Sequence, residues 1–219
     1  MLNYYVLLFF FYSFLGWLLE VIANFVSKKE FVNRGFFIGP YCPIYGCGCL
    51  LLILFLGKYV NEPITLFILA VVICSILEYF TSWTLEKIFK MRWWDYSQRK
   101  FNIDGRVCLE TMVPFGIMGV LVVKYLNPLI LKLLSKVSPI VLNIIVIILL
   151  VIFAIDFIVS SNIIFNIKSI VKNVKKDSTE EIKKIINKKI KNHLNLYSRL
   201  LKSFPNFNKI KINKTKKKK

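Results

Sequence analysis

The sequence predicts an all-α membrane protein: a bundle of about five transmembrane helices with a duplicated helical hairpin, followed by a basic amphipathic C-terminal helix. Three observations support this fold class. Apolar residues make up 56% of the 219 residues, and the mean hydropathy is +0.59. The charged residues, 20% of the chain, cluster between and after the apolar stretches. A short motif also occurs twice, 66 residues apart, near the ends of two apolar stretches.

Five apolar stretches are long enough to cross about 30 Å of hydrocarbon as helices. They comprise residues 4–26, 38–60, 64–89, 107–126 and 139–165. The first lacks the basic start and the small-residue cleavage site of a signal peptide, so we expect a retained span. These stretches define a transmembrane domain over residues 1–167, with hairpin repeats at 4–60 and 64–126 and a fifth span at 139–165.

The duplicated motif indicates that the first four spans form two related hairpins. The landmarks of the two copies are, in order, Trp17, Glu20, Gly35 and Pro43, and Trp83, Glu86, Gly105 and Pro114. The spacing from tryptophan to glycine is 18 and 22 residues, and the spacing from glycine to proline is 8 and 9. Transporters use internal repeats of this kind to build a site between two halves of the molecule.

Lysine and arginine are distributed unequally between the two sides of the predicted membrane domain. With the N-terminus outside, 27 of these residues lie on the inner side and 4 on the outer side. Without the tail the bias is still 9 against 4. The positive-inside rule therefore predicts an outer N-terminus and a cytoplasmic C-terminus.

The composition changes at residue 168, where a basic cytoplasmic tail (168–219) begins. Ser178 and Glu181 have the spacing of a capping box, and isoleucine and leucine then recur on one helical face. This pattern predicts an amphipathic helix over residues 179–203. We expect it to bind the anionic lipids of the inner leaflet, with a protein partner as the alternative. No nucleic-acid-binding module is recognisable, so nucleic acid is not an expected partner.

Motifs for a metal, a cofactor or nucleotide hydrolysis are absent from the sequence. The five cysteines form no Cys-x-x-Cys pair, and the single histidine, His193, lies in the tail. The chain also has no P-loop, no Gly-x-Ser-x-Gly and no His-Glu-x-x-His motif. We therefore expect no cofactor, no metal and no ATPase activity of its own, and the sequence favours a protein that is not an enzyme.

Charged residues near the cytoplasmic ends of the spans are the candidates for binding a substrate. An acidic group in a span costs about 2.5–3.5 kcal/mol on insertion scales, so each requires a partner or a function. The candidates are Glu20, Arg34, Glu78, Glu86, Asp95, Arg106 and Glu110. A further acidic residue, Asp156, lies in the fifth span.

Two interpretations of these charges are compatible with each other. In the first, the glutamate and the arginine of each repeat form a buried ion pair. These pairs would be Glu20 with Arg34 and Glu86 with Arg106. In the second, some of the same groups also bind a solute, a proton or a lipid head group.

The start of the second span and the loop before the fourth carry further signals. Residues 35–46 contain three glycines and two prolines, which predicts a helix that is kinked or begins late. The positive dipole ends at the N-termini of the second and fourth spans would favour an anion on the cytoplasmic side. Alternatively, Gly35 and Gly39 serve only to let two helices pack closely. The aromatic residues of loop 91–106 fit a membrane-interface belt, and Asp95 beside them is placed to contact a head group or a partner.

Residues 14–20, 33–46 and 93–110 resemble a family of small bacterial membrane proteins described as putative ABC-transporter type IV, or CmpB. The resemblance covers residues 1–160 and excludes the basic tail. It implies a permease subunit in the bacterial cytoplasmic (inner) membrane. Such a permease would need a separate ATPase subunit, and loop 91–106 is the candidate surface for docking it.

The function expected first is therefore that of a permease-like transporter subunit with an inward-facing polar site. One alternative is a membrane enzyme or binding protein that acts on a lipid head group through Asp95, Arg106 and Glu110. Another is a non-catalytic scaffold that binds a partner through its tail. A two-fold symmetric homodimer is the default expectation for so few spans.

Overall fold

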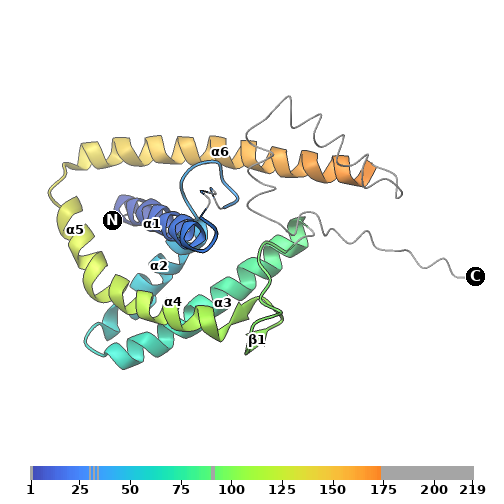
Figure 1. Ribbon diagram of the computed structural model, residues 1–219. Coiled ribbons are helices and arrows are strands. Elements are labelled where there is room, and N and C mark those ends of the chain that lie inside the picture. Colours follow the sequence, from blue (N-terminus) through green and yellow to red (C-terminus); the bar gives the residue numbers. More distant parts are fainter. Residues whose placement is uncertain (1, 30, 32, 34, 90–91, 174–219) are drawn as a thin grey trace, which may run out of the picture.

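The computed structural model describes residues 2–29, 31, 33, 35–89 and 92–173, with side chains up to residue 165 except that of Lys28. The helices are α1 (Leu2–Lys28), α2 (Pro43–Leu56), η1 (Gly57–Tyr59), α3 (Pro63–Phe89), α4 (Leu109–Leu121), η2 (Val122–Leu126), α5 (Asn127–Leu134) and α6 (Pro139–Asn173) (Figure 1). Two short strands, β1 (Asn102–Ile103) and β2 (Val107–Cys108), connect α3 to α4. The all-α prediction is confirmed. The amphipathic helix predicted at 179–203 lies outside the described residues.

Four helical segments of the described chain, rather than about five, are long and apolar enough to cross a membrane. They are Leu2–Ser27, Pro63–Phe89, Leu109–Leu134 and Pro139–Phe165. The stretch predicted as the second span, residues 38–60, forms only the shorter helix Pro43–Tyr59. At 1.5 Å per residue this helix extends about 25 Å, which is less than the hydrocarbon thickness.

The second helix begins late because the residues before it cannot form a regular helical turn. Gly35 has a φ of +127°, and the N–H of Tyr41 bonds to the carbonyl of Gly39. Pro40 and Pro43 have no N–H to donate, and Pro43 occupies the start of α2, where no donor is needed. The sequence prediction of a kinked or late start is confirmed.

The fourth span is longer than the predicted 107–126 because helix continues from α4 through η2 into α5. The five residues of η2 form a π-helical turn, in which the N–H of Asn127 bonds to the carbonyl of Val122. Pro128 follows directly and has no N–H for the preceding turn. The wider turn therefore carries the helix past the proline without ending it.

Close helix contacts at glycines join α1 to α2 and α3 to α4. A Cβ atom on Gly46 of α2 would lie 2.3 Å from Oγ of Ser13 in α1. A Cβ atom on Gly116 of α4 would lie 2.5 Å from Cγ2 of Val71 in α3. Each hairpin thus needs a residue without a side chain on its second helix. The internal duplication of the sequence stays a prediction.

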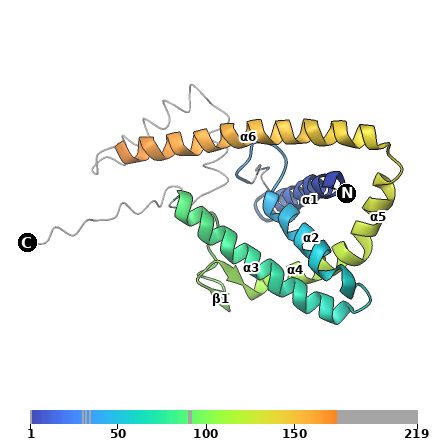
Figure 2. The ribbon, with the colours of Figure 1, turned by 180° about the vertical axis from the view of Figure 1, so that it is seen from behind.

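Helix α6 extends along one side of the molecule (Figures 1 and 2), and Phe165 near its end contacts Phe89 at the end of α3. Leu142 and Val146 pack against Leu7 of α1, whereas most other apolar side chains of α6 are exposed. Exposed apolar residues on a candidate span suit contact with lipid. The helix runs to Asn173, past the predicted end of the span at residue 165.

Candidate functional site

Glu78 lies at the centre of the candidate site, on the side of α3 that faces the first turn of α4. It is 5% exposed. Its carboxylate accepts a hydrogen bond from the hydroxyl of Tyr96 at 3.3 Å and one from Thr111 at 3.4 Å. Both donors are neutral, and no lysine or arginine in the described part of the chain forms an ion pair with Glu78.

Glu20 lies in the first hairpin, on α1 opposite the first turn of α2, although its counterpart in the sequence repeat is Glu86 rather than Glu78. The hydroxyl of Tyr45 donates a hydrogen bond to Glu20 Oε1 at 2.7 Å. The Tyr45 ring fits because Gly16 has no side chain, since a Cβ atom there would lie 2.2 Å from the ring. Arg34, the predicted partner of Glu20, lies outside the described residues.

Tyr96 lies within electrostatic range of both carboxylates. Burial and then the carboxylates of Glu78 and Glu20 raise the pKa of its phenol, which remains a neutral hydrogen-bond donor. The two acidic groups, contributed by α1 and α3, therefore face one polar region lined by phenol and hydroxyl groups.

The helix N-termini that were expected to favour an anion face carboxylates of the protein itself. Tyr45 and Thr111 are the third residues of α2 and α4, and they donate to Glu20 and Glu78, respectively. The positive end of each helix dipole is therefore partly compensated internally. This geometry favours a proton or a cation over an anion.

Arg106 forms the predicted ion pair with Glu86. Its Nη2 lies 2.7 Å from Glu86 Oε2, and its Nη1 donates to Ser82 at 3.2 Å. The residue is 8% exposed, and its guanidinium lies 5.6 Å from the centre of the Tyr79 ring. Arg92 also binds Glu86, with Nε at 3.2 Å. The network fastens the loop before α4 to the last turns of α3.

Asp95 and Glu110 are not brought into the buried cluster. The hydroxyl and the N–H of Ser97 donate to Asp95, and these bonds lower the pKa of its carboxyl group despite partial burial. Glu110 forms a pair with Arg99 at 2.9 Å, and both side chains are more than half exposed. Asp95 therefore shapes the loop, and Glu110 lies on the surface.

Asp156 is a partly buried polar centre to which the sequence analysis assigned no role. Its carboxylate accepts hydrogen bonds from the N–H groups of Ile38 and Gly39 at 3.0 and 2.7 Å. The hydroxyls of Tyr41 and Ser160 also donate to it. An acidic residue in the most apolar span, with serine one turn later, was the available signal. The hydroxyl donors Tyr45, Tyr96 and Thr111 carried no signal of comparable strength.

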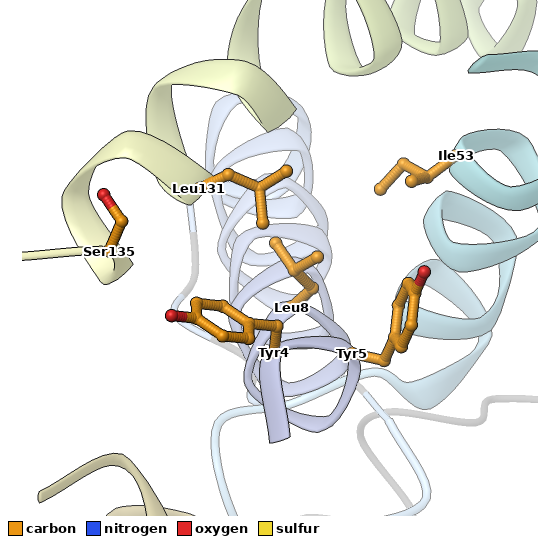
Figure 3. Close-up of a pocket in the computed structure, with 6 residues that line it drawn as sticks. All are labelled: Tyr4, Tyr5, Leu8, Ile53, Leu131 and Ser135. Atoms are coloured by element: carbon orange, nitrogen blue, oxygen red, sulfur yellow. The ribbon is translucent and has the colours of Figure 1, made fainter. Parts of the chain in front are cut away.

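A separate cavity of about 300 Å³ lies at the opposite end of α1. Figure 3 shows its lining residues, which come from α1, α2, α5 and the residue after α5: Tyr4, Tyr5, Leu8, Ile53, Leu131 and Ser135. None of these side chains is charged, and none belongs to the candidate set. The cavity is therefore distinct from the polar cluster.

Comparison with known proteins places the chain in one family. The model of the family described as "Putative ABC-transporter type IV" matches residues 7–161, well over half of the chain. No curated protein and no solved structure gives a significant match. The chain belongs to the putative ABC-transporter type IV family and is a multi-pass membrane protein with four candidate spans.

Proposed function

We propose that the protein is a permease-like transporter subunit whose polar site, centred on Glu78 and Glu20, opens toward the cytoplasm. Membership of the ABC-transporter type IV family supports a role in transport. The observation that carries the proposal is the burial of Glu78 in a candidate span, where the described residues supply it with two neutral donors. The subunit would have no ATPase activity of its own and would act with a separate ATPase.

The environment of Glu78 makes its ionised form expensive. A carboxylate in a span costs about 2.5–3.5 kcal/mol unless charge or strong hydrogen bonds compensate it. Arg106, the buried cation of the described residues, is instead paired with Glu86. Uptake of a proton or a cation next to Glu78 would remove this cost, and release would restore it. Such a group can couple occupancy of the site to a change between two arrangements of the hairpins.

The buried ion pair has a positioning role in this proposal. Arg106 holds the loop between α3 and α4 against α3, and the carbonyl of Arg106 accepts a hydrogen bond from Trp94 at 2.9 Å. Tyr96, two residues later, donates its backbone N–H to Gly105. These contacts orient the Tyr96 hydroxyl toward Glu78.

The alternative of an enzyme acting on lipid head groups gains no support from the geometry. It required Asp95, Arg106 and Glu110 to converge on one reacting centre. Arg92 links Asp95, at 3.5 Å, to Glu86 and so to Arg106, but Glu110 lies apart from them, paired with Arg99 on the surface.

The permease assignment is tested by purifying the tagged full-length protein from its native membrane in mild detergent. Mass spectrometry should then detect an ATPase subunit at a constant ratio to the protein. Recovery of the protein alone, under conditions that preserve known membrane complexes from the same cells, would contradict the assignment.

The role of Glu78 is tested by infrared difference spectroscopy of the protein in lipid vesicles during titration with acid and with alkali-metal salts. The wild type should show a carboxylic-acid carbonyl band that disappears in Glu78→Gln. Glu110→Gln is the matched control, because Glu110 is exposed and already paired. If Glu78→Gln and Glu110→Gln both retain the wild-type band, the proposed site is wrong.

A further inference from the structure

We infer that an apolar edge of the β-hairpin, formed by Phe101 just before β1 and Ile103 in β1, inserts into the lipid head-group region and anchors the hairpin at the membrane surface. Phe101 is 79% exposed and Ile103 is 55% exposed. Two large apolar side chains with this much exposure, two residues apart in a loop, indicate an interaction surface. The inference does not depend on the proposed transport function.

The depth of Phe101 is fixed by its contact with the start of a span. The N–H of Leu109 donates to the carbonyl of Phe101 at 3.3 Å. Leu109 is the first residue of the candidate span Leu109–Leu134. Phe101 therefore lies at the level where that span enters the membrane, and an outward-pointing ring at this level meets lipid or a neighbouring protein.

Continuity with an apolar stripe on α4 favours lipid over a protein. Four residues spaced four apart along this helix are each 41–51% exposed: Leu109, Val113, Ile117 and Leu121. Because this spacing follows one side of a helix, the stripe forms a continuous outer surface of the span. The hairpin extends it at one end, and both overall views place the hairpin at the edge of the molecule remote from α6 (Figures 1 and 2).

The backbone at Phe101 provides independent support for a function of its ring. Phe101 has a φ of +51°, in the left-handed region that a bulky residue rarely adopts. Glycine or asparagine would adopt this conformation more readily. Within the described residues the ring makes no aromatic contact, so internal stacking does not explain a phenylalanine here. Contact of the ring with the acyl chains near the interface explains the phenylalanine.

Basic residues next to this apolar edge suit the phosphate groups of anionic lipids. Lys100 is exposed, and Arg99 is largely exposed although it also contacts Glu110. A cation flanking an apolar side chain is the usual composition of a segment that binds a membrane interface. The partner we assign to this surface is therefore an anionic lipid bilayer.

The test is photocrosslinking with p-benzoyl-phenylalanine placed at single positions of the full-length protein in vesicles of phosphatidylglycerol and phosphatidylethanolamine. Position 101 tests the apolar edge of the β-hairpin. Position 113 is the positive control on the α4 stripe, and position 98, an exposed glutamine in the same loop, is the polar control. Mass spectrometry should find phospholipid adducts at 101 and 113 and few or none at 98.

Two outcomes would overturn the inference. One is an absence of lipid adducts at position 101 while position 113 gives them. The other is predominant crosslinking of position 101 to a protein, which would identify the apolar edge as a protein-docking surface. A second variant, Phe101→Asn, keeps a residue that tolerates positive φ. It should increase hydrogen exchange of the hairpin amides in anionic nanodiscs, and unchanged exchange would also contradict the anchor.

Discussion

Asp156 Oδ2 accepts a hydrogen bond from the backbone N–H of Gly39 at 2.7 Å, across 117 positions of the sequence. The other carboxylate oxygen accepts from the N–H of Ile38 at 3.0 Å. Backbone donors without partners are costly in the membrane, and residues 35–42 have no helix to provide them. The side chain of Asp156 thus replaces helical carbonyls and fastens the entry to α2 onto α6.

Removal of this acceptor should destabilise the fold. Asp156→Ala leaves two partly buried backbone donors without an acceptor, at about 1–3 kcal/mol each, so we expect the free energy of unfolding to fall by roughly 2–6 kcal/mol, toward the lower end if water reaches them. Denaturant titration in detergent micelles, followed by tryptophan fluorescence, measures this change. Ser160→Ala is the control because it removes one donor to Asp156 and leaves both backbone bonds in place. Equal effects of the two substitutions would contradict the structural role of Asp156.

The ion pair between Arg106 and Glu86 should show strong energetic coupling. Arg106→Met removes the buried partner of Glu86, whose side chain is 35% exposed, so the loss should be smaller than the roughly 3–5 kcal/mol typical of a fully buried pair. Arg92, which also pairs with Glu86 and remains in this variant, should reduce the loss of stability further. Glu86→Gln in the same chain should recover part of the loss, and a double-mutant cycle on unfolding free energies measures the coupling.

The pair of Arg99 and Glu110 is the internal control for that cycle. Its side chains are 60% and 56% exposed, and exposed pairs contribute about 0–1 kcal/mol. We therefore expect much weaker coupling for Arg99→Met with Glu110→Gln. A cycle that finds similar coupling for both pairs would show that Arg106 is not a buried anchor of the loop.

Acid should loosen the loop before α4 through Asp95. Hydrogen bonds from Ser97 hold the pKa of Asp95 below its usual value of 3.8 in the folded protein. The stabilisation is therefore complete above the unfolded-state pKa and is lost as pH falls through the lower folded-state value. Hydrogen exchange at the Ser97 amide should accelerate below about pH 4 relative to Asp95→Asn, which lacks this titration. A constant ratio of the two exchange rates across this range would contradict the prediction.

The sequence predicts the helical class and one of the ion pairs because both depend on local signals. Apolar stretches locate the spans, and the repeated Trp-x-x-Glu motif followed by a glycine and arginine leads to Glu86 and Arg106. Composition alone does not show that α2 is too short to span, because residues 35–42 carry no charge and include apolar side chains. The backbone conformation at Gly35 and the two prolines, Pro40 and Pro43, delay the start of the helix.

The rest of the site depends on contacts between distant segments. Asp156 binds residues more than 100 positions away, and Glu78 receives its donors from the loop and the start of α4. Asp95 and Glu110 were candidates together with Glu78, yet loop geometry turns them toward Ser97 and Arg99. No periodicity encodes these choices, because a two-strand hairpin and residues with positive φ set the path of the loop.

Glycine contacts between helices give the last prediction. A Cβ atom at Gly46 would lie 2.3 Å from Ser13 Oγ and 2.5 Å from the carbonyl oxygen of Phe9, so α1 and α2 must separate in Gly46→Ala. Overpacking of this kind typically costs about 1–3 kcal/mol. Gly57→Ala is the matched control, because a Cβ atom there would have no other atom within 4 Å and the φ of −54° suits alanine. That substitution should be neutral or stabilise the protein by about 0.4–1 kcal/mol. Thermal unfolding in detergent measures both variants, and a Gly46→Ala protein as stable as Gly57→Ala would show that the first hairpin does not require this close approach.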